Sequence, residues 1–114
     1  MSLKSTIAFE DFNKLDLRIG TIIKVRDFPK AHRPAFQLDI DFGPLGIKKS
    51  SAQITKLYTK ETLLNKQIIA NVNFKPKQIA NYFSECLVLG VPDKQQNIVL
   101  LAVTSPVLNG TQVL

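Results

Sequence analysis

Residues 36–56 read FQLDIDFGPLGIKKSSAQITK, and their order of apolar, turn and polar residues predicts a β-hairpin. Residues 36–42 alternate apolar and polar side chains, which is the period of a half-buried β-strand. The GPLG segment at 43–46 then turns the chain. Residues 46–56 are therefore predicted to return as the antiparallel partner of the first strand, and the other elements are placed around this hairpin.

On the N-terminal side of the hairpin, LDLRIGTIIKV at 15–25 predicts another apolar strand, with Gly20 where a bulge or tight bend would fit. On the C-terminal side, residues 57–65 predict a short helix. Thr59 is its expected N-cap, and its leucines, Leu57, Leu63 and Leu64, are expected to face inward.

Three further strands are predicted at 66–74, 85–91 and 97–103, the last two joined by the polar turn PDKQQN. Asn109-Gly110 predicts a tight turn near the C-terminus. Three strands, a helix and then further strands is the order of an all-β oligonucleotide-binding (OB) fold. This fold is a five-stranded Greek-key barrel, here with a short helix between strands 3 and 4.

The length of 114 residues fits one domain covering residues 1–114. The formal net charge is +6, and nearly all of the excess lies in residues 43–79, where seven lysines face Glu61 alone. A segregated positive field attracts polyanions, although a merely solubilising surface is the alternative.

One cysteine, Cys86, cannot form an internal disulfide, which favours a reducing compartment. No apolar run has the length of a signal peptide or a membrane span. We therefore expect a cytoplasmic protein without membrane insertion. Cys86 itself adjoins an apolar run and is expected to be a buried packing residue.

The strand at 46–56 carries polar side chains on both faces. Lysines on an edge strand prevent edge-to-edge aggregation, which is one explanation. Paired serines and a glutamine serve that purpose less well, whereas together with lysine they make a set that contacts phosphate and sugar. The predicted RNA-contacting residues of this strand are Lys48, Lys49, Ser50, Ser51 and Gln53.

A second basic and polar cluster follows the fourth predicted strand, where Pro76 holds a loop extended. Its members are Asn73, Lys75, Lys77 and Gln78. In an OB barrel the loops and one open sheet face form the oligonucleotide surface, so the two clusters are expected to converge. The flanking aromatic residues Phe74, Tyr82 and Phe83 are candidates for stacking on bases, and burial in the core is the alternative. Burial is favoured most for Phe74, which is expected on the apolar face of the strand at 66–74.

Few residues suggest any other chemistry. His32 is the only histidine and has no metal-ligand spacing around it, so it is not expected to be catalytic, and with Arg33 it is a candidate phosphate contact. Asp39 and Asp41 are explained by a solvent-facing strand face better than by a divalent-cation site. No catalytic motif is present. We predict no catalytic residue, no metal and no cofactor.

Three stretches carry a family resemblance: LDLRIGTIIKV, FGPLGIKKSSAQITKLYTKETLLNKQIIANVNF and KPKQIANYFSECLVLG. From about residue 10 to 114 the sequence resembles the tRNA-binding domain family, the EMAP II-like OB domains. Within that family it is most similar to free-standing CsaA-type secretion chaperones. Synthetase-appended members have a more basic run where this chain has KPKQIAN, so fewer phosphate contacts are expected here.

The resemblance implies RNA-facing positions at Asn73, Lys75, Lys77, Ser84 and Glu85, beside Ser50, Ser51 and Gln53. It also implies a homodimer, with residues 1–14 and 104–114 lying across the partner. For CsaA-type members it further implies an apolar cavity that takes unfolded preproteins, for which Phe28, Phe36, Tyr82 and Phe83 are candidate contacts.

Three functions remain open from the sequence. The first is a non-enzymatic protein that binds tRNA or another structured RNA and serves as an export chaperone. The second is a purely polypeptide-binding chaperone with little RNA affinity. The third is a tRNA-binding accessory to an aminoacyl-tRNA synthetase.

Overall fold

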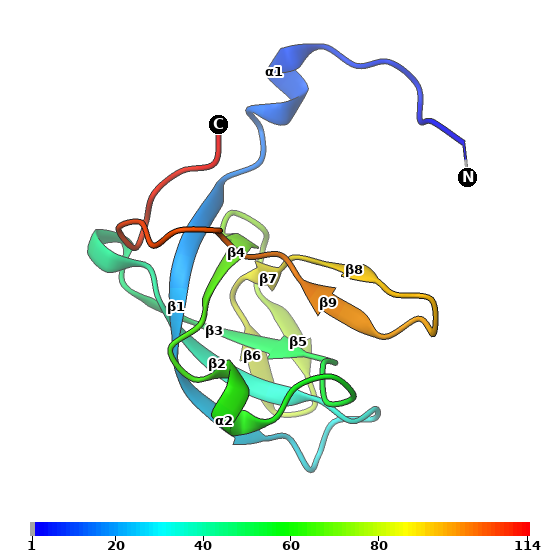
Figure 1. The fold of residues 1–114 in the computed structure, drawn as a ribbon, viewed down its shortest axis with the longest axis vertical. Coiled ribbons are helices and arrows are strands. Elements are labelled where there is room, and N and C mark those ends of the chain that lie inside the picture. Colours follow the sequence, from blue (N-terminus) through cyan, green and yellow to red (C-terminus); the bar gives the residue numbers. More distant parts are fainter. Residues whose placement is uncertain (1) are drawn as a thin grey trace.

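The computed structural model describes residues 2–114 and is built on a five-stranded antiparallel sheet (Figure 1). The strands lie in the order β3-β2-β1-β4-β7. Their bounds are Leu17–Asp27 for β1, Phe36–Asp41 for β2, Ile47–Ala52 for β3, Gln67–Asn71 for β4 and Leu87–Val88 for β7. The sheet curls into a nearly closed barrel, which confirms the predicted OB-type fold.

The long strand β1 makes the barrel possible because its two halves have different partners. Residues 17–21 pair with β4, and residues 21–27 pair with β2. The β1–β2 register shifts between Ile22 and Lys24, so the bulge does not lie at Gly20, where the sequence suggested it. Gly20 is needed for close packing instead, because a Cβ atom there would lie 2.6 Å from Cγ2 of Ile40.

The core fills the barrel with the apolar faces that the strand periodicity predicts. Alternate residues of β2 point inward, and Leu38 and Ile40 are completely buried. Ile22, Phe42, Leu63, Ile68 and Ala70 are also fully buried around them. Burial of these side chains is the main source of the barrel's stability.

The helices are shorter than expected. The predicted helix at 57–65 is a single turn, α2 (Lys60–Leu63), with the Thr59 hydroxyl accepting from the Thr62 amide at 3.2 Å. Because one turn presents only one side chain to the core, Leu63 is buried while Leu57 and Leu64 are exposed. Two other short elements are α1 (Phe9–Phe12) and the 3-10 turn η1 (Gly43–Leu45).

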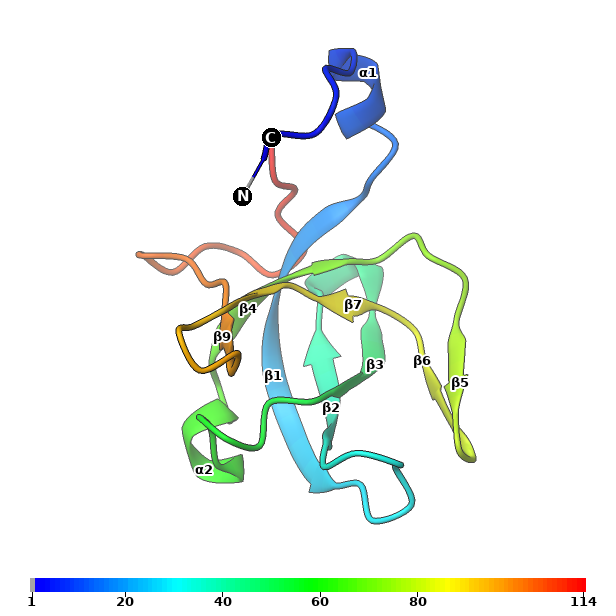
Figure 2. The ribbon, with the colours of Figure 1, turned by 90° about the vertical axis from the view of Figure 1, so that its right-hand side faces the viewer.

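Two β-hairpins extend the barrel (Figure 2). The first, β5 (Lys77–Ile79) with β6 (Tyr82–Ser84), occupies a stretch that the sequence suggested was a loop. The second, β8 (Gly90–Pro92) with β9 (Ile98–Leu100), encloses the predicted polar turn. Its β8 continues from β7 after a break at Leu89, so the single strand expected at 85–91 is two short strands with different partners.

The terminal segments differ in how they are held. The Asn109-Gly110 turn forms as predicted, and residues 110–113 then run along β1, with the Ile19 amide donating to Thr111 O at 3.0 Å. The N-terminal segment with α1 projects from the barrel (Figure 1). Within residues 2–114, the helices are all too short to cross a bilayer.

Candidate nucleic-acid interface

A cleft of about 590 Å³ lies between β3 and the β5–β6 hairpin. Ser51 of β3 and Gln53 just after that strand line one side, and Lys75 and Lys77 reach the cleft from the segment before β5 and from β5 itself. The two polar clusters are more than twenty residues apart in the chain, yet they contribute to the same cavity. Its other wall is apolar and includes Ile54, Leu87, Val88, Ile98 and Leu100.

The β5–β6 hairpin is held over the barrel by Tyr82. The Tyr82 ring packs edge-on against Phe28, with 5.3 Å between ring centroids. Burial of the phenol, reinforced by the Asp39 carboxylate, raises the pKa of Tyr82 to about 12. This anchoring fixes the hairpin that carries Lys77, which lines the cleft.

Cross-strand pairing decides which hairpin residues face the cleft. Lys77 pairs with Ser84, and both line the cavity. Gln78 pairs with Phe83, one position along, and successive residues of a strand point to opposite faces. Gln78 and Phe83 therefore face away from the cleft, and Phe83 is 56% exposed.

Several residues that the sequence suggested for RNA binding close the barrel seam. The Ser50 hydroxyl is buried and donates to Cys86 O at 2.9 Å. The Ser51 amide donates to the Ser84 hydroxyl at 3.1 Å, and the Lys49 amide donates to a Glu85 carboxylate oxygen at 2.9 Å. The Glu85 amide in turn donates to Lys49 O at 2.7 Å. These bonds replace a regular ladder between β3 and residues 84–86.

Cys86 lies inside this seam and is buried, as predicted. Burial raises the pKa of its thiol to about 11, and the hydrogen bond with Ser50 offsets only part of that effect. A protonated buried thiol is a packing group and not a nucleophile.

Asn73 also has a structural partner. Its side-chain oxygen accepts from the Asp16 amide at 3.1 Å, and its amide nitrogen donates to Lys14 O at 2.7 Å. Asn73 thus fastens the start of β1 to the segment after β4. Whether Asn73, Ser84 or Glu85 also touches RNA stays a prediction.

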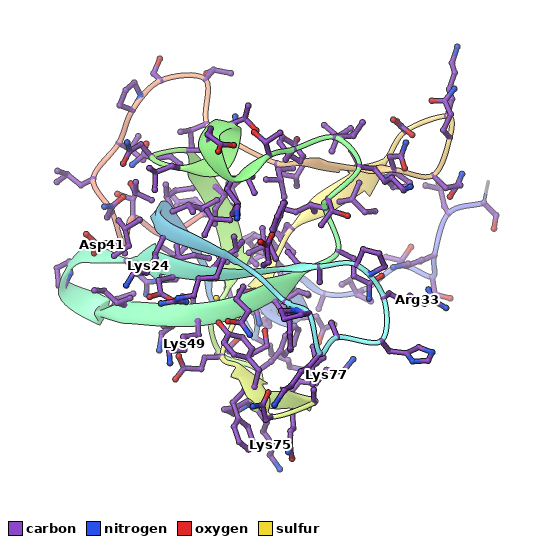
Figure 3. The ribbon with its side chains drawn as sticks, turned by 90° about the horizontal axis from the view of Figure 1, so that it is seen from below. Lys24, Arg33, Asp41, Lys49, Lys75 and Lys77 are labelled. Carbon is purple, nitrogen blue, oxygen red and sulfur yellow. The ribbon has the colours of Figure 1, made fainter. Side chains whose placement is uncertain are left out.

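The basic residues around the cleft are free of ion pairs. Among residues 2–114 the four ion pairs are Lys14–Asp11, Arg18–Asp16, Arg26–Asp39 and Lys60–Asp27. Lys49, Lys75 and Lys77 are exposed and belong to none of them. Figure 3 shows these three lysines toward the lower side of the view, around the hairpin, while Lys24 lies farther up at the left. Their charge is therefore available to a polyanion.

The remaining residues predicted to contact a ligand differ in their position and burial. His32 and Arg33 line a smaller hollow of about 220 Å³ together with Lys77, so the β1–β2 loop adjoins the cleft. Lys48 is half-buried on the same side of β3 as Ser50. Phe28 and Phe36 are buried at 5% and 7% exposure, with Phe36 in the barrel core.

Sequence reasoning gave too little weight to two side chains that line these hollows. Phe74 was expected on the inner face of a longer strand, but β4 ends at Asn71 and Phe74 lines the cleft at 50% exposure. Lys56 lines a further hollow beside Arg33. The Pro76 that follows Phe74 by two residues was the available signal that the strand stops early.

Comparison with known proteins matches residues 17–112 to a family model described as a tRNA binding domain. The chain belongs to the tRNA-binding domain family. The crystal structure of the CsaA chaperone from Bacillus anthracis is 51% identical in sequence, with a TM-score of 0.89 over 96% of this chain and 99% of that one. The CsaA chaperone from Picrophilus torridus is 47% identical with the same TM-score, over 96% and 100% of the two chains.

The family also links this chain to a larger enzyme. The methionine–tRNA ligase of Pyrococcus horikoshii is 36% identical over 107 residues, which is 94% of this chain but 14% of the ligase. That of Porphyromonas gingivalis is 35% identical over 107 residues, 15% of its length. The chain thus spans about a seventh of these relatives. The family it shares with them is a binding domain and not a catalytic one.

Proposed function

We propose that this protein binds tRNA or another structured RNA through the surface around the cleft. The observation that carries the proposal is the convergence of unpaired Lys75 and Lys77 with Ser51 and Gln53 on one cavity. Membership of the tRNA-binding domain family supports the same ligand class.

Each part of the surface has a distinct role in this proposal. Lys49, Lys75 and Lys77 neutralise phosphates, which supplies most of the affinity and makes it depend on salt. Gln53 and the outward-facing Ser51 supply short directional hydrogen bonds to sugar or base. The carboxylate of Glu85 sits beside these groups and opposes anion binding, while its bond to the Lys49 amide keeps the seam closed.

A charge-matched pair of variants tests whether binding is local to the cleft. Lys75→Glu with Lys77→Glu lowers the net charge by four, and so does Lys4→Glu with Lys94→Glu, whose residues line none of the three hollows. In a filter-binding titration with tRNA, we expect the cleft double variant to lose at least about tenfold in affinity. The slope of log K against log salt should also fall by roughly 1.4 to 1.8.

The control double variant should retain most of the wild-type affinity and slope. If both double variants lose affinity equally, binding reflects overall charge and the cleft is not the site. If the wild-type protein binds no tRNA at low salt, the proposal is wrong altogether.

A second function, chaperone-like binding of unfolded polypeptides, is favoured by the apolar wall of the same cleft. Leu87, Ile98 and Phe74 would take an apolar side chain there, and the two solved CsaA relatives are described as chaperones. Exported proteins held in the cytoplasm are the client class that the resemblance implies. Aggregation of a reduced, unfolded client should be slowed at stoichiometric ratio, and Leu87→Glu should abolish the effect.

We also propose that the protein is a homodimer. The terminal segments expose large apolar side chains, among them Ile7 at 67%, Phe9 at 72% and Leu108 at 85%. Large apolar side chains exposed in both terminal segments are suited to contact with another chain, where they would be removed from water. Sedimentation equilibrium should give twice the 12.7 kDa chain mass, and Phe9→Glu with Leu108→Glu should give the single mass.

A further inference from the structure

Three hollows adjoin one another on the face that carries the cleft. The cleft of about 590 Å³ is followed by the hollow of about 220 Å³ under the β1–β2 loop and by one of about 360 Å³ next to the β8–β9 turn. Gln53 lines all three, Lys77 lines the first two, and Arg33 lines the last two. The shared residues place the three hollows side by side, and we refer to this row of hollows as the groove.

The charged side chains at the end of the groove away from the cleft are positive. Arg33 and Lys56 are exposed there and belong to none of the ion pairs within residues 2–114. No acidic residue lines either of the two smaller hollows. Figure 3 shows Arg33 on the opposite side of the view from Lys49, with Lys77 between them. Cationic groups therefore recur along the groove at intervals.

Gln53, which directly follows β3, differs from the residues of that strand in having a free side chain. The seam bonds of this strand use Lys49, Ser50 and Ser51, and the Gln53 amide takes part in none of them. A primary amide offers both donor and acceptor, which is the combination that reads the edge of a base. Cationic side chains lie on either side of Gln53, and a nucleotide chain likewise has a phosphate on either side of each base.

We infer that the groove binds a single-stranded stretch of RNA, with Arg33 and Lys56 holding phosphates beyond the cleft and Gln53 contacting a base edge. This inference rests on the proposed function and names the part of the RNA that enters the site. Proteins bind duplex RNA mostly through its shape, its 2′-hydroxyls and its phosphates, whereas an unpaired base can turn its hydrogen-bonding edge toward a side chain such as Gln53. Unpaired bases can enter, and Phe74 beside the cleft gives one of them a surface to stack on.

Binding of fluorescein-labelled oligoribonucleotides of about 12 residues, measured by anisotropy, tests the inference. The probes are the four homopolymers and a fully paired hairpin of similar charge. Arg33→Gln with Lys56→Gln should weaken single-strand binding about tenfold and lower the salt slope by about 1.4, with little change for the hairpin. Lys4→Gln with Lys94→Gln is the control of matched charge. Thermal unfolding confirms that each variant is folded.

Gln53→Ala separates base contact from phosphate contact. This substitution should reduce the differences in affinity among the four homopolymers and leave the slope of log K against log salt unchanged. If tRNA binding depends on Lys75 and Lys77 but not on Arg33 and Lys56, the extended groove is wrong and the proposed function stands. If the hairpin binds as tightly as the single strands, the single-strand inference is overturned. If no RNA binds, both proposals fail.

Discussion

Glu85→Gln should move stability and RNA affinity in opposite directions. The Glu85 carboxylate accepts a hydrogen bond from the Lys49 amide at 2.9 Å and lies in the lining of a cleft that also holds Lys75 and Lys77. Glutamine keeps an oxygen that accepts the same bond but loses the assistance of the charge. Because the site is exposed and water competes, we expect a loss of about 0.5–1 kcal/mol in the free energy of unfolding.

The same substitution removes one negative charge from the surface that meets phosphate. A unit charge about 8 Å from a phosphate in a mostly aqueous setting contributes about 0.5 kcal/mol, so RNA affinity should rise about two- to threefold. Glu85→Ala, which loses the acceptor as well, should destabilise the barrel further with a similar gain in affinity.

Thermal unfolding by circular dichroism and filter binding with tRNA measure the two effects on the same samples. We expect the midpoint of unfolding to fall by about 2–5 °C for Glu85→Gln. The reasoning is refuted if tRNA affinity falls while stability is unchanged, because Glu85 would then contact the RNA directly, as the family resemblance suggested.

Three further predictions concern the barrel. Tyr82→Phe should leave the free energy of unfolding unchanged or raise it by about 1 kcal/mol, because the buried Tyr82 hydroxyl has no hydrogen-bond partner among residues 2–114. A clear loss of stability in a urea titration would mean that the hydroxyl is hydrogen-bonded. Gly20→Ala should cost roughly 1–3 kcal/mol, because its Cβ would lie 2.6 Å from Ile40 and 2.7 Å from Phe42, and an unchanged urea midpoint would contradict this packing. The thiol of Cys86 has a pKa of about 11 in the folded protein against an ordinary value of 9.0. Stability should therefore fall by up to about 2 kcal/mol as pH rises from about 9 to 11, and Cys86→Ala should flatten that decline; equal slopes in the two proteins would show that the thiol is not shielded.

The barrel could be predicted from the sequence because its strands bury one face, and alternation records which face that is. Residues 36–42 and the apolar runs at 15–25 and 66–74 carry this signal. The β5–β6 hairpin carries a much weaker signal, because its inner face mixes Lys77 with Tyr82 and its outer face holds Phe83. Its turn at Ala80 has φ of 53°, a conformation for which alanine gives no warning.

The candidate site could be predicted in its location but not in the role of each residue. The lysines and serines of β3 and the glutamine that follows it are equally consistent with phosphate contacts and with seam bonds. The two roles are distinguished by the atoms of residues 84–86 that lie opposite β3. Only the fold places Ser84 and Glu85 against β3, so Ser50 is buried there while Ser51 and Gln53 line the cleft.

Lysine footprinting with and without bound tRNA shows whether the lysines around the cleft contact RNA. Acetylation of each lysine is measured by mass spectrometry at a tRNA concentration that saturates the protein. We expect strong protection of Lys75 and Lys77, protection of Lys49, and unchanged modification of Lys4 and Lys94. Saturating tRNA that leaves Lys75 and Lys77 as reactive as in the free protein would contradict this expectation.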